Sequence, residues 1–586
     1  MAARWAKGHY AGGGVSVVRS ASDVGLVSLA TFVTAQVGLC WWGRIDYPFD
    51  LEWMEGGMLA HAWRLQQGLP LYAAPTADWI PYVYPPGYPA LLALLGLPVG
   101  LTPLLGRAVS ILGSLMAAGS VAAVCLSAGV RAPIAVGAAA SFLATYEAGG
   151  AFFDLVRPDG LFLGLCGLAI AAALRPGWAA AAGVALALGI LLKHNAAGWL
   201  PVLALGVGLR DGRRAALTFL IAACALPAVV FGALQWTTDG HLLRYLVEVP
   251  ASHPLVAGRG LPGVAGELAH AMPVALAVVG LWSWLRASWG GRGVALVVAA
   301  VAGGGASWME PGGGVGSVAE TAVGAAVFAG VVVTWGWRRP AWPSPAVVIG
   351  VGVGAIAVGL AAWMRAHHGG FLNVLIPMYW AFCCALGVAA DRLGRRWRWA
   401  DAFLACGLVG AQILFSASSS DWARLIPTRM DREAGERWIE VLRNCDGPVF
   451  SPYAAWLPTY AGHAPEAHLI ALWDIDHARG PYKADVAKFH LAAKNHRWAC
   501  VVDSNGKGVG FGIPQAYRRE TTVVRSGGVF VPKTGWRVQP EALWVPSGTS
   551  GAPSQAPRGA AATEASQPLG EGEGAEPSDK GGARSP

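Results

Sequence analysis

The feature that most constrains this chain is a series of apolar runs, each about as long as a membrane-spanning helix. The runs recur from Val24 to about Phe415 and then stop. A helix that crosses the hydrocarbon core of a bilayer needs roughly 20 apolar residues. Only 13% of the residues are charged and 54% are hydrophobic, whereas soluble domains carry about 25% charged residues. The sequence therefore predicts a polytopic α-helical membrane protein.

The apolar runs divide this part of the chain into about 13 expected transmembrane helices. The expected spans are 22–43, 108–129, 132–150, 159–175, 178–192, 196–209, 215–235, 268–286, 293–309, 320–337, 345–364, 371–390 and 401–418. The run 87–106 is also apolar but contains Pro98 and Pro103. When this run stays on the outer side, most Lys and Arg residues of the loops fall in the cytoplasm, as the positive-inside rule requires. We therefore interpret 87–106 as a re-entrant or surface-lying helix.

The same patterns divide the chain into domains. Residues 1–21 form a cytoplasmic N-terminus, and residues 22–418 form the transmembrane domain, with a first outer loop at 44–107. Residues 419–545 alternate amphipathic and strand-like segments, so we expect a small α/β domain outside the cytoplasm. Residues 546–586 are rich in Gly, Ala, Pro, Ser and Glu and carry almost no large apolar residues. We expect this tail to be disordered, because it cannot bury enough apolar surface to fold.

Charge and cysteine usage narrow the classes of partner. The net charge is +8, but the basic residues stand in short clusters between apolar runs, so nucleic acid is not an expected partner. No Cys or His spacing indicates a metal site, so no cofactor is expected, and a divalent metal is left open. Cys445 and Cys500 lie outside the apolar part. They either form a disulfide in an oxidising compartment or remain two separate buried thiols.

The first outer loop concentrates carboxylates. Asp50, Glu52 and Glu55 cluster at and just before the start of a short helix with one apolar face, which is typical of a helix lying on a membrane. Carboxylates at a helix N-terminus are stabilised by a few tenths of a kcal/mol, and this is the structural explanation for them. Three carboxylates exceed what capping needs, so the loop is a candidate source of a general base at the membrane surface.

Two further polar segments interrupt the apolar runs. Asp154, Arg157 and Asp159 stand between two expected spans; they either start a helix with a local ion pair or hold an anionic substrate through Arg157. Lys193 and His194 stand between two short spans. A lysine flanked by apolar residues is costly at membrane depth, so Lys193 either snorkels to the interface or contacts a phosphate.

A last polar segment opens a later span. It runs from Arg365 to Asn373 and contains His367, His368 and two glycines. The glycines permit close approach of the backbone to a ligand. Two adjacent histidines in a loop are weak evidence for a metal site.

Together these segments resemble the GT-C superfamily of membrane glycosyltransferases, and within it the bacterial group similar to protein O-mannosyltransferases and lipid A aminoarabinose transferases. The resemblance covers about residues 22–418. It rests on the acidic stretch Asp50 to Glu55, Tyr84-Pro85-Pro86-Gly87-Tyr88, Arg157-Pro158-Asp159, Lys193 and Gly369-Gly370-x-x-Asn373. Many relatives carry an adjacent Asp-Glu pair in the first loop, whereas here Met54 precedes Glu55. Which carboxylate is the base is therefore open.

The resemblance implies an enzyme of the bacterial inner membrane, with its C-terminal domain extracytoplasmic. It would transfer a hexosyl or pentosyl group, with inversion, from a polyprenyl-phosphate donor within the membrane lipids. The acceptor would be a glycan, lipid or protein outside the cytoplasm. The expected catalytic carboxylates are, in order, Glu55, Asp50 and Glu52. The expected substrate-binding residues are Asp154, Arg157, Asp159, Lys193, His194, His368 and Asn373.

Two other classes compete with this interpretation. A transporter or lipid flippase would show repeated halves and broken helices at the membrane midplane, and a membrane scaffold would only bind a partner through its C-terminal domain. The arrangement of Asp50, Glu55, Asp159 and Lys193 discriminates between them. Convergence on one outer cavity favours the enzyme, a midplane tunnel favours the transporter, and scattered positions favour the scaffold.

Overall fold

The computed structural model describes residues 2–286, 344–396, 401–477, 479–504, 509–523 and 529–548. The predicted spans 293–309 and 320–337, and nearly all of the tail 546–586, lie outside the described residues. The described residues up to Ser547 pack as one compact unit.

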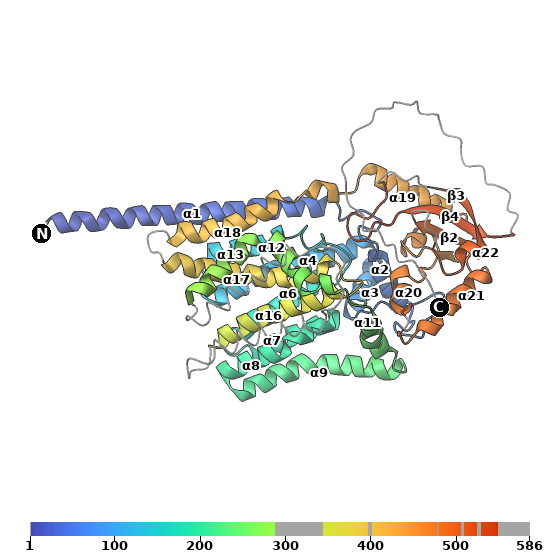
Figure 1. The fold of residues 1–586 in the computed structure, drawn as a ribbon, viewed down its shortest axis with the longest axis horizontal. Coiled ribbons are helices and arrows are strands. Elements are labelled where there is room, and N and C mark those ends of the chain that lie inside the picture. The colour runs from blue at the N-terminus through green and yellow to red at the C-terminus, as the bar shows by residue number, and fades with distance from the viewer. Residues whose placement is uncertain are drawn as a thin grey trace, which may run out of the picture. The chain divides into compact units, whose positions relative to one another are not determined.

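The apolar part is a set of helices packed side by side (Figure 1). Its described helices are α1 (Ala2–Trp42), α2 (Glu55–Gln66), α3 (Gly87–Val99), α4 (Pro103–Ser127), α5 (Ala132–Ala144), α6 (Asp159–Ala173), α7 (Ala179–Leu192), α8 (Leu200–Asp211), α9 (Arg213–Thr237), α10 (His241–Leu243), α11 (Val249–Ser252), α12 (Leu261–Ala271), α13 (Pro273–Arg286), α16 (Pro345–Ala366), α17 (Ile376–Arg396) and α18 (Asp401–Ser418), with short helical turns η1 (His194–Trp199), η2 (Arg244–Glu248), η3 (Ala257–Arg259) and η5 (Leu372–Leu375). Helix α4 packs on α6, α6 on α7 and α7 on α9, while α1, α5, α17 and α18 pack together. The site described below lies at one end of these helices.

Length and composition identify the helices that can cross a membrane. Among the described residues there are 5 such helices, or up to 7 if each of two bent pairs is one span. Four shorter apolar helices, α3, α5, α6 and α7, have 13 to 15 residues each. The multi-pass character agrees with the sequence pattern, and the count of about 13 spans stays a prediction.

Helix α3 occupies the run that was expected to be re-entrant or surface-lying. It has 13 residues, which gives about 20 Å at 1.5 Å per residue, less than the ~30 Å hydrocarbon core. It ends at Gly100, whose φ of 81° is in the left-handed region that glycine tolerates best. Thr102 then caps α4, because its hydroxyl accepts a hydrogen bond from the Leu105 amide at 3.2 Å. Helix α5 has the same length, so the re-entrant or surface-lying role of 87–106 stays a prediction.

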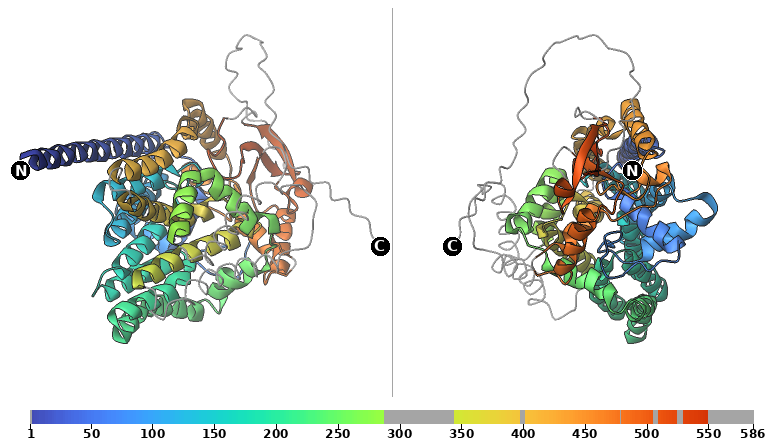
Figure 2. Two further views of the ribbon diagram at one scale, coloured as in Figure 1. Left: turned by 60° about the vertical axis from the view of Figure 1, so that its left-hand side comes forward. Right: turned by 90° about the vertical axis from the view of Figure 1, so that its right-hand side faces the viewer.

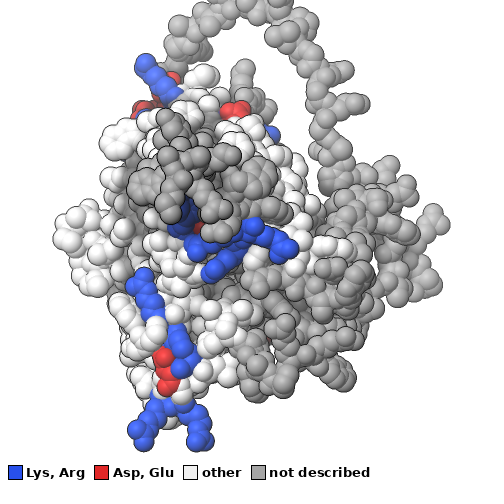
Figure 3. Space-filling view, turned by 90° about the vertical axis from the view of Figure 1, so that its left-hand side faces the viewer, with Lys and Arg blue, Asp and Glu red and all other residues white. Residues whose placement is uncertain are grey.

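Basic side chains mark one end of the bundle. Arg175 follows α6, Arg213 and Arg214 open α9, and Arg395 and Arg396 close α17, and all five are exposed. Figure 3 views the molecule from the side on which the N-terminus lies in Figure 1, and on this face Lys and Arg outnumber Asp and Glu. The positive-inside rule assigns such a face to the cytoplasm.

Residues 419–546 combine short helices with a small sheet (Figures 1 and 2). The described elements are η6 (Trp422–Leu425), α19 (Arg429–Leu442), β1 (Val449–Phe450), η7 (Leu457–Ala461), α20 (Leu469–Ile475), η8 (Lys483–Val486), α21 (Ala487–Lys494), β2 (Cys500–Ser504), α22 (Ile513–Ala516), β3 (Tyr517–Thr522) and β4 (Pro540–Pro546). The strand order is β1-β2-β4-β3, with β1 parallel to β2 and the other pairs antiparallel. Thr428 and Asp431 form a capping box that starts α19. An α/β arrangement is therefore present where the sequence predicted one.

The two cysteines outside the apolar part form a disulfide. Cys445, just after α19, is bonded to Cys500 at the start of β2, and their Cα atoms are 6.0 Å apart. The bond ties the end of α19 to the sheet across 55 residues of sequence. Of the two possibilities that the sequence left open, the disulfide is confirmed.

We expect Cys500→Ser to lower the free energy of unfolding by about 2–4 kcal/mol, because a disulfide limits the conformations of the unfolded chain. Thermal melting of the full chain under non-reducing conditions measures the loss. Cys224→Ser is the matched control, since Cys224 is an exposed free cysteine of α9. Equal melting temperatures for Cys500→Ser and the wild type would show that the bond does not form in the purified protein.

Candidate functional site

The site lies where the transmembrane helices are interrupted. Helix α5 ends at Ala144, earlier than the predicted span 132–150, and α6 begins only at Asp159. Every residue from 149 to 160 is buried. Non-helical backbone at membrane depth is tolerated where it is buried in protein or lines a cavity. The interruption therefore places the backbone and side chains of this segment inside the protein.

Close packing of α4 on α6 fixes the start of α6. A Cβ atom at Gly113 would lie 2.2 Å from the amide nitrogen of Leu161, and one at Gly160 would lie 2.4 Å from the hydroxyl oxygen of Ser114. Neither position can carry a larger side chain without moving the helices apart. These glycines thereby position Asp159, the first residue of α6.

Five of the predicted site residues form one buried polar network. Lys193 Nζ lies 2.6 Å from Asp159 Oδ1, and Asn373 Nδ2 donates to the same oxygen at 3.0 Å. Arg157 Nε lies 3.9 Å from Asp159 Oδ2, and Arg157 Nη1 lies 3.5 Å from Glu52 Oε2. All five residues are buried. Residues from the first outer loop, the α5–α6 interruption, the end of α7 and η5 thus converge.

Tyr84, for which the sequence predicted no role, belongs to this network. Arg157 Nη2 donates to the Tyr84 hydroxyl at 2.7 Å. The Arg157 guanidinium and the Lys193 ammonium lie 5.3 and 5.9 Å from the centre of the Tyr84 ring, within cation–π distance. The sequence carried a signal for Tyr84, because this residue opens the Tyr-Pro-Pro segment before α3. Both cations therefore lie within reach of one ring, and two cations in one region suit binding of a phosphate.

Glu55 is held by four hydrogen bonds. Its carboxylate accepts from the amides of Leu51 at 2.6 Å and Val156 at 2.8 Å, and from Arg107 Nε at 3.1 Å and Nη2 at 2.7 Å. Burial opposes ionisation, but Arg107 and the amides outweigh it and lower the pKa of Glu55. A carboxylate held in this way is a weak proton acceptor and a strong tether. It joins the first loop to α4 and to the α5–α6 interruption, which differs from the base role that we expected.

One further hydrogen bond of Arg107 and one further buried ion pair support the loop, and neither was predicted from the sequence. Arg107 also donates to the carbonyl oxygen of Phe49 at 2.7 Å. Arg44 Nε lies 2.9 Å from Asp154 Oδ2, and the Tyr146 hydroxyl donates to Asp154 Oδ1 at 2.7 Å. Asp154 thus pairs with Arg44 and not with the Arg157 network. An arginine within the apolar run of α4 was a usable signal, since ionised groups there need a partner.

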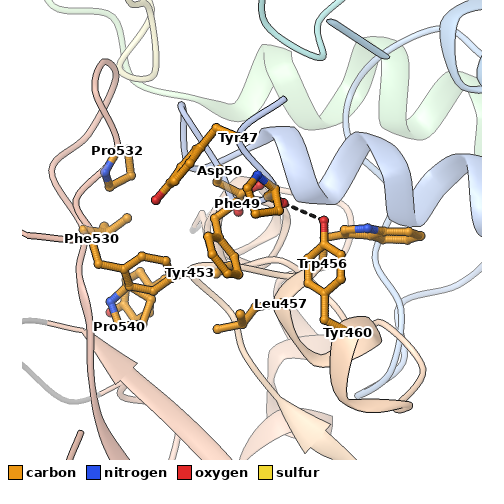
Figure 4. A pocket seen from close by; sticks show the side chains of 13 residues that line it. Tyr47, Phe49, Asp50, Tyr453, Trp456, Leu457, Tyr460, Phe530, Pro532 and Pro540 are labelled. Carbon is orange, nitrogen blue, oxygen red and sulfur yellow. Dashed lines mark hydrogen bonds between the residues drawn. The ribbon is translucent and has the colours of Figure 1, made fainter. Parts of the chain in front are cut away.

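Asp50 lies at the edge of a small cleft (Figure 4). The cleft has a volume of about 20 Å³, and its wall includes Tyr47, Tyr453, Trp456 and Phe530. Burial raises the pKa of Asp50 well above its usual range, and the nearby charge of the loop carboxylates adds to the effect. A carboxyl in this setting holds its proton more tightly than one in water.

Glu52 is buried against the cationic end of the network. Burial raises its pKa to about 7, although Arg157 opposes the shift. None of the described residues donates a hydrogen bond to its Oε2 atom. A Cβ atom at Gly535 would lie 2.8 Å from Glu52 Cγ, so the backbone of the C-terminal part reaches this carboxylate directly. Glu52 therefore combines a pKa near neutrality with an oxygen that can accept a proton.

The two histidines of the predicted set lie outside the network's hydrogen bonds. His194 is half-buried, and its Nδ1 atom has no hydrogen-bond partner among the described residues. His368 is exposed, and its backbone bonds to Pro254 at 3.1 Å and Arg259 at 3.2 Å. Within the described part of the chain, no group of three or more His, Cys, Asp or Glu could hold a metal ion.

Comparison with known proteins bears on the fold. No protein-family model matches the chain, and no curated protein matches it. It is similar to ArnT from Cupriavidus metallidurans bound to undecaprenyl phosphate, with a TM-score of 0.50 and 14% identity, over 89% of this chain and 99% of that chain. Apo ArnT from Cupriavidus metallidurans has a TM-score of 0.44 and 15% identity, over 88% of this chain and 97% of that chain. The apo oligosaccharyltransferase of Archaeoglobus fulgidus has a TM-score of 0.41 and 12% identity, over 82% of this chain and 69% of that chain. The first match shows that the chain shares the fold of this ArnT structure, and the apolar helices agree with a polytopic helical membrane protein, so the fold that the resemblance implied is observed.

Proposed function

We propose that this chain, which has the GT-C fold, is a membrane glycosyltransferase that takes its sugar from a polyprenyl-phosphate carrier. The observation that carries the proposal is the convergence of two buried cations, Arg157 and Lys193, on Asp159, with the carboxylate of Glu52 beside Arg157. A lipid phosphate needs cations near it, and an acceptor hydroxyl needs a base. The lipid bound to ArnT, undecaprenyl phosphate, supports this class of carrier.

The chemistry follows from the geometry of the network. The acceptor hydroxyl attacks the anomeric carbon with inversion, and Glu52 takes the hydroxyl proton. The bond from the anomeric carbon to the phosphate oxygen breaks, and its electron pair stays on the lipid phosphate. Arg157 and Lys193 stabilise this charge, while Asp159 orients Lys193. Asp50 is the second candidate base, and Glu55 acts as a positioning residue through Arg107.

The network lies at helix ends, which favours the enzyme over a transporter. Asp159 opens α6, Lys193 follows α7 and Asn373 lies in η5, immediately before α17. Glu55 joins this cluster through the Val156 amide, next to Arg157. Of the four discriminating residues, Asp159 and Lys193 meet in the network and Glu55 adjoins it, whereas Asp50 lies at the separate cleft. This partial convergence supports an enzyme over a scaffold. The hexosyl or pentosyl identity of the sugar stays a prediction.

The phosphate site is tested by binding of undecaprenyl phosphate to the full chain in lipid nanodiscs. We expect Lys193→Ala to raise the Kd about 10- to 100-fold, because a hydrogen bond to a charged group contributes roughly 1.5–3 kcal/mol. Lys193→Arg should recover part of the affinity, since charge returns with a different shape.

Undecaprenol, which lacks the phosphate, should bind the wild type and Lys193→Ala equally. Arg213→Ala is the matched control, because Arg213 is an exposed cation at the start of α9. If Lys193→Ala leaves the affinity for undecaprenyl phosphate unchanged, the phosphate site is misplaced.

We further propose that the protein resides in the bacterial inner membrane with its C-terminal part outside the cytoplasm. The exposed arginines at one end of the bundle support this topology. A phosphatase fused after residue 545 is expected to be active, and a fluorescent protein that folds only in the cytoplasm should remain dark. The reverse pattern would place the site on the cytoplasmic side.

A further inference from the structure

Three tryptophans from distant segments meet beside Glu52. Trp53 follows Glu52 in the first outer loop, Trp473 lies in α20, and Trp536 lies in the segment before β4. The centroids of Trp53 and Trp536 are 5.1 Å apart, those of Trp473 and Trp536 are 4.9 Å apart, and those of Trp53 and Trp473 are 5.9 Å apart. We call these three residues the tryptophan cluster.

The register of two segments places the cluster next to the carboxylate. The Thr534 amide donates to the Leu51 carbonyl at 3.2 Å. Gly535 then packs on Glu52, where a Cβ atom would lie 2.8 Å from Cγ, and its φ of 77° also requires a glycine. The next residue on each segment is a tryptophan of the cluster. Trp53 therefore directly follows the proposed base, and Trp536 directly follows the glycine that packs on that base.

The cluster is held firmly but leaves an open surface. Buried His468 donates to the Trp53 carbonyl at 2.8 Å, and its other ring nitrogen accepts from the Ile470 amide at 3.0 Å. Burial lowers the pKa of His468 to about 3, so this neutral arrangement persists. Trp53 is only 5% exposed, whereas Trp536 is 43% exposed. A large apolar ring that remains exposed beside a base is available to a ligand.

We propose that the tryptophan cluster is the acceptor subsite and that the group it binds is a sugar ring. This inference rests on the proposed function and extends it to the acceptor. The face of an indole ring carries partial negative charge, so it packs against the polarised C–H groups on one face of a sugar. This contact leaves the hydroxyls at the ring edge unoccupied. A sugar-bearing acceptor is thus bound by its apolar face and deprotonated at one edge hydroxyl.

The test measures binding of methyl β-D-glucoside and methyl N-acetyl-β-D-glucosaminide to the full chain in nanodiscs, by saturation-transfer NMR of the ring C–H protons. We expect saturation with the wild type, about tenfold weaker binding to Trp536→Ala, and near wild-type binding to Trp536→Phe. Trp236→Ala is the matched control, because Trp236 of α9 is 86% exposed. Sorbitol, an acyclic polyol, should not be saturated.

Each outcome decides the inference. Absence of saturation with the wild type, or equal binding to Trp536→Ala and the wild type, overturns the acceptor subsite. Equal losses in Trp536→Ala and Trp236→Ala also overturn it, and indicate that both rings act as anchors at the membrane interface. Binding of undecaprenyl phosphate in the same nanodiscs reports on the proposed function separately. If that lipid phosphate fails to bind while the glycosides bind at Trp536, the carrier assignment fails and the sugar subsite stands.

Discussion

Replacing Glu52 by glutamine is expected to lower the rate of sugar transfer by about 10²–10⁴-fold, the usual contribution of a general base. The amide keeps the size of the side chain but cannot accept the proton of the acceptor hydroxyl. Turnover is measured as release of polyprenyl phosphate from a panel of polyprenyl-phosphate hexoses and pentoses. Binding of undecaprenyl phosphate should change little, because Arg157 and Lys193 remain. The loss should therefore fall on kcat.

The pH profile gives this prediction a second measurement. Only the ionised carboxylate accepts a proton, and burial raises the pKa of Glu52 to about 7. The rate should therefore rise with pH through about 7 and level off above it, and the residual activity of Glu52→Gln should lack this inflection. Asp78→Asn is the control, since Asp78 is 52% exposed and pairs with Arg497 at 2.5 Å. If Asp50→Asn removes the inflection and Glu52→Gln does not, the base is Asp50.

The sequence was informative where a polar or charged residue stands at a break between two apolar runs. Asp159, Lys193 and Asn373 each stand at a break in an apolar pattern, and helix ends packed in one layer bring such breaks together. An ionisable group beside an apolar run needs a partner or a ligand, so these positions were visible without a structure. The sequence singled out Cys445 and Cys500 as the two cysteines outside the apolar runs, but it left open whether they form a disulfide, which the structure shows.

Long-range pairing was not visible. Glu55 and Arg107 are 52 residues apart, and nothing in the local pattern says that one neutralises the other. Glu55 was ranked first as a base from its place at the start of α2. Its ion pair with Arg107 of α4 instead ties the first loop to that helix. His368 was assigned from neighbouring glycines, but the turn directs it outward. The tryptophan cluster unites three distant segments, and a single sequence carries no signal for such a meeting.

Removing Arg107 is expected to destabilise the protein by about 3–5 kcal/mol, because it leaves the carboxylate of Glu55 buried without its partner. Both side chains are at most 1% exposed, so water cannot replace the lost hydrogen bonds. Arg107→Met and Glu55→Gln should each lower the melting temperature of the full chain in detergent. The double variant should recover part of the loss, since no uncompensated charge remains. The exposed pair Arg429–Glu433 is the control, and its removal should cost about 0.5 kcal/mol or less.

The same variants decide between the two roles of Glu55. If Glu55 is a tether, the Glu55→Gln variant must lose stability together with activity, and the matching change at Arg107 must restore part of the stability. If Glu55 is the general base, the Glu55→Gln variant must instead lose turnover at an unchanged melting temperature, and no change at Arg107 can restore that turnover. Glu55→Gln that melts like the wild type but transfers no sugar would return the base to Glu55, and Glu52 would then be a residue that positions Arg157. The four donors around Glu55 favour the first result, because each stabilises the ionised carboxylate against taking a proton.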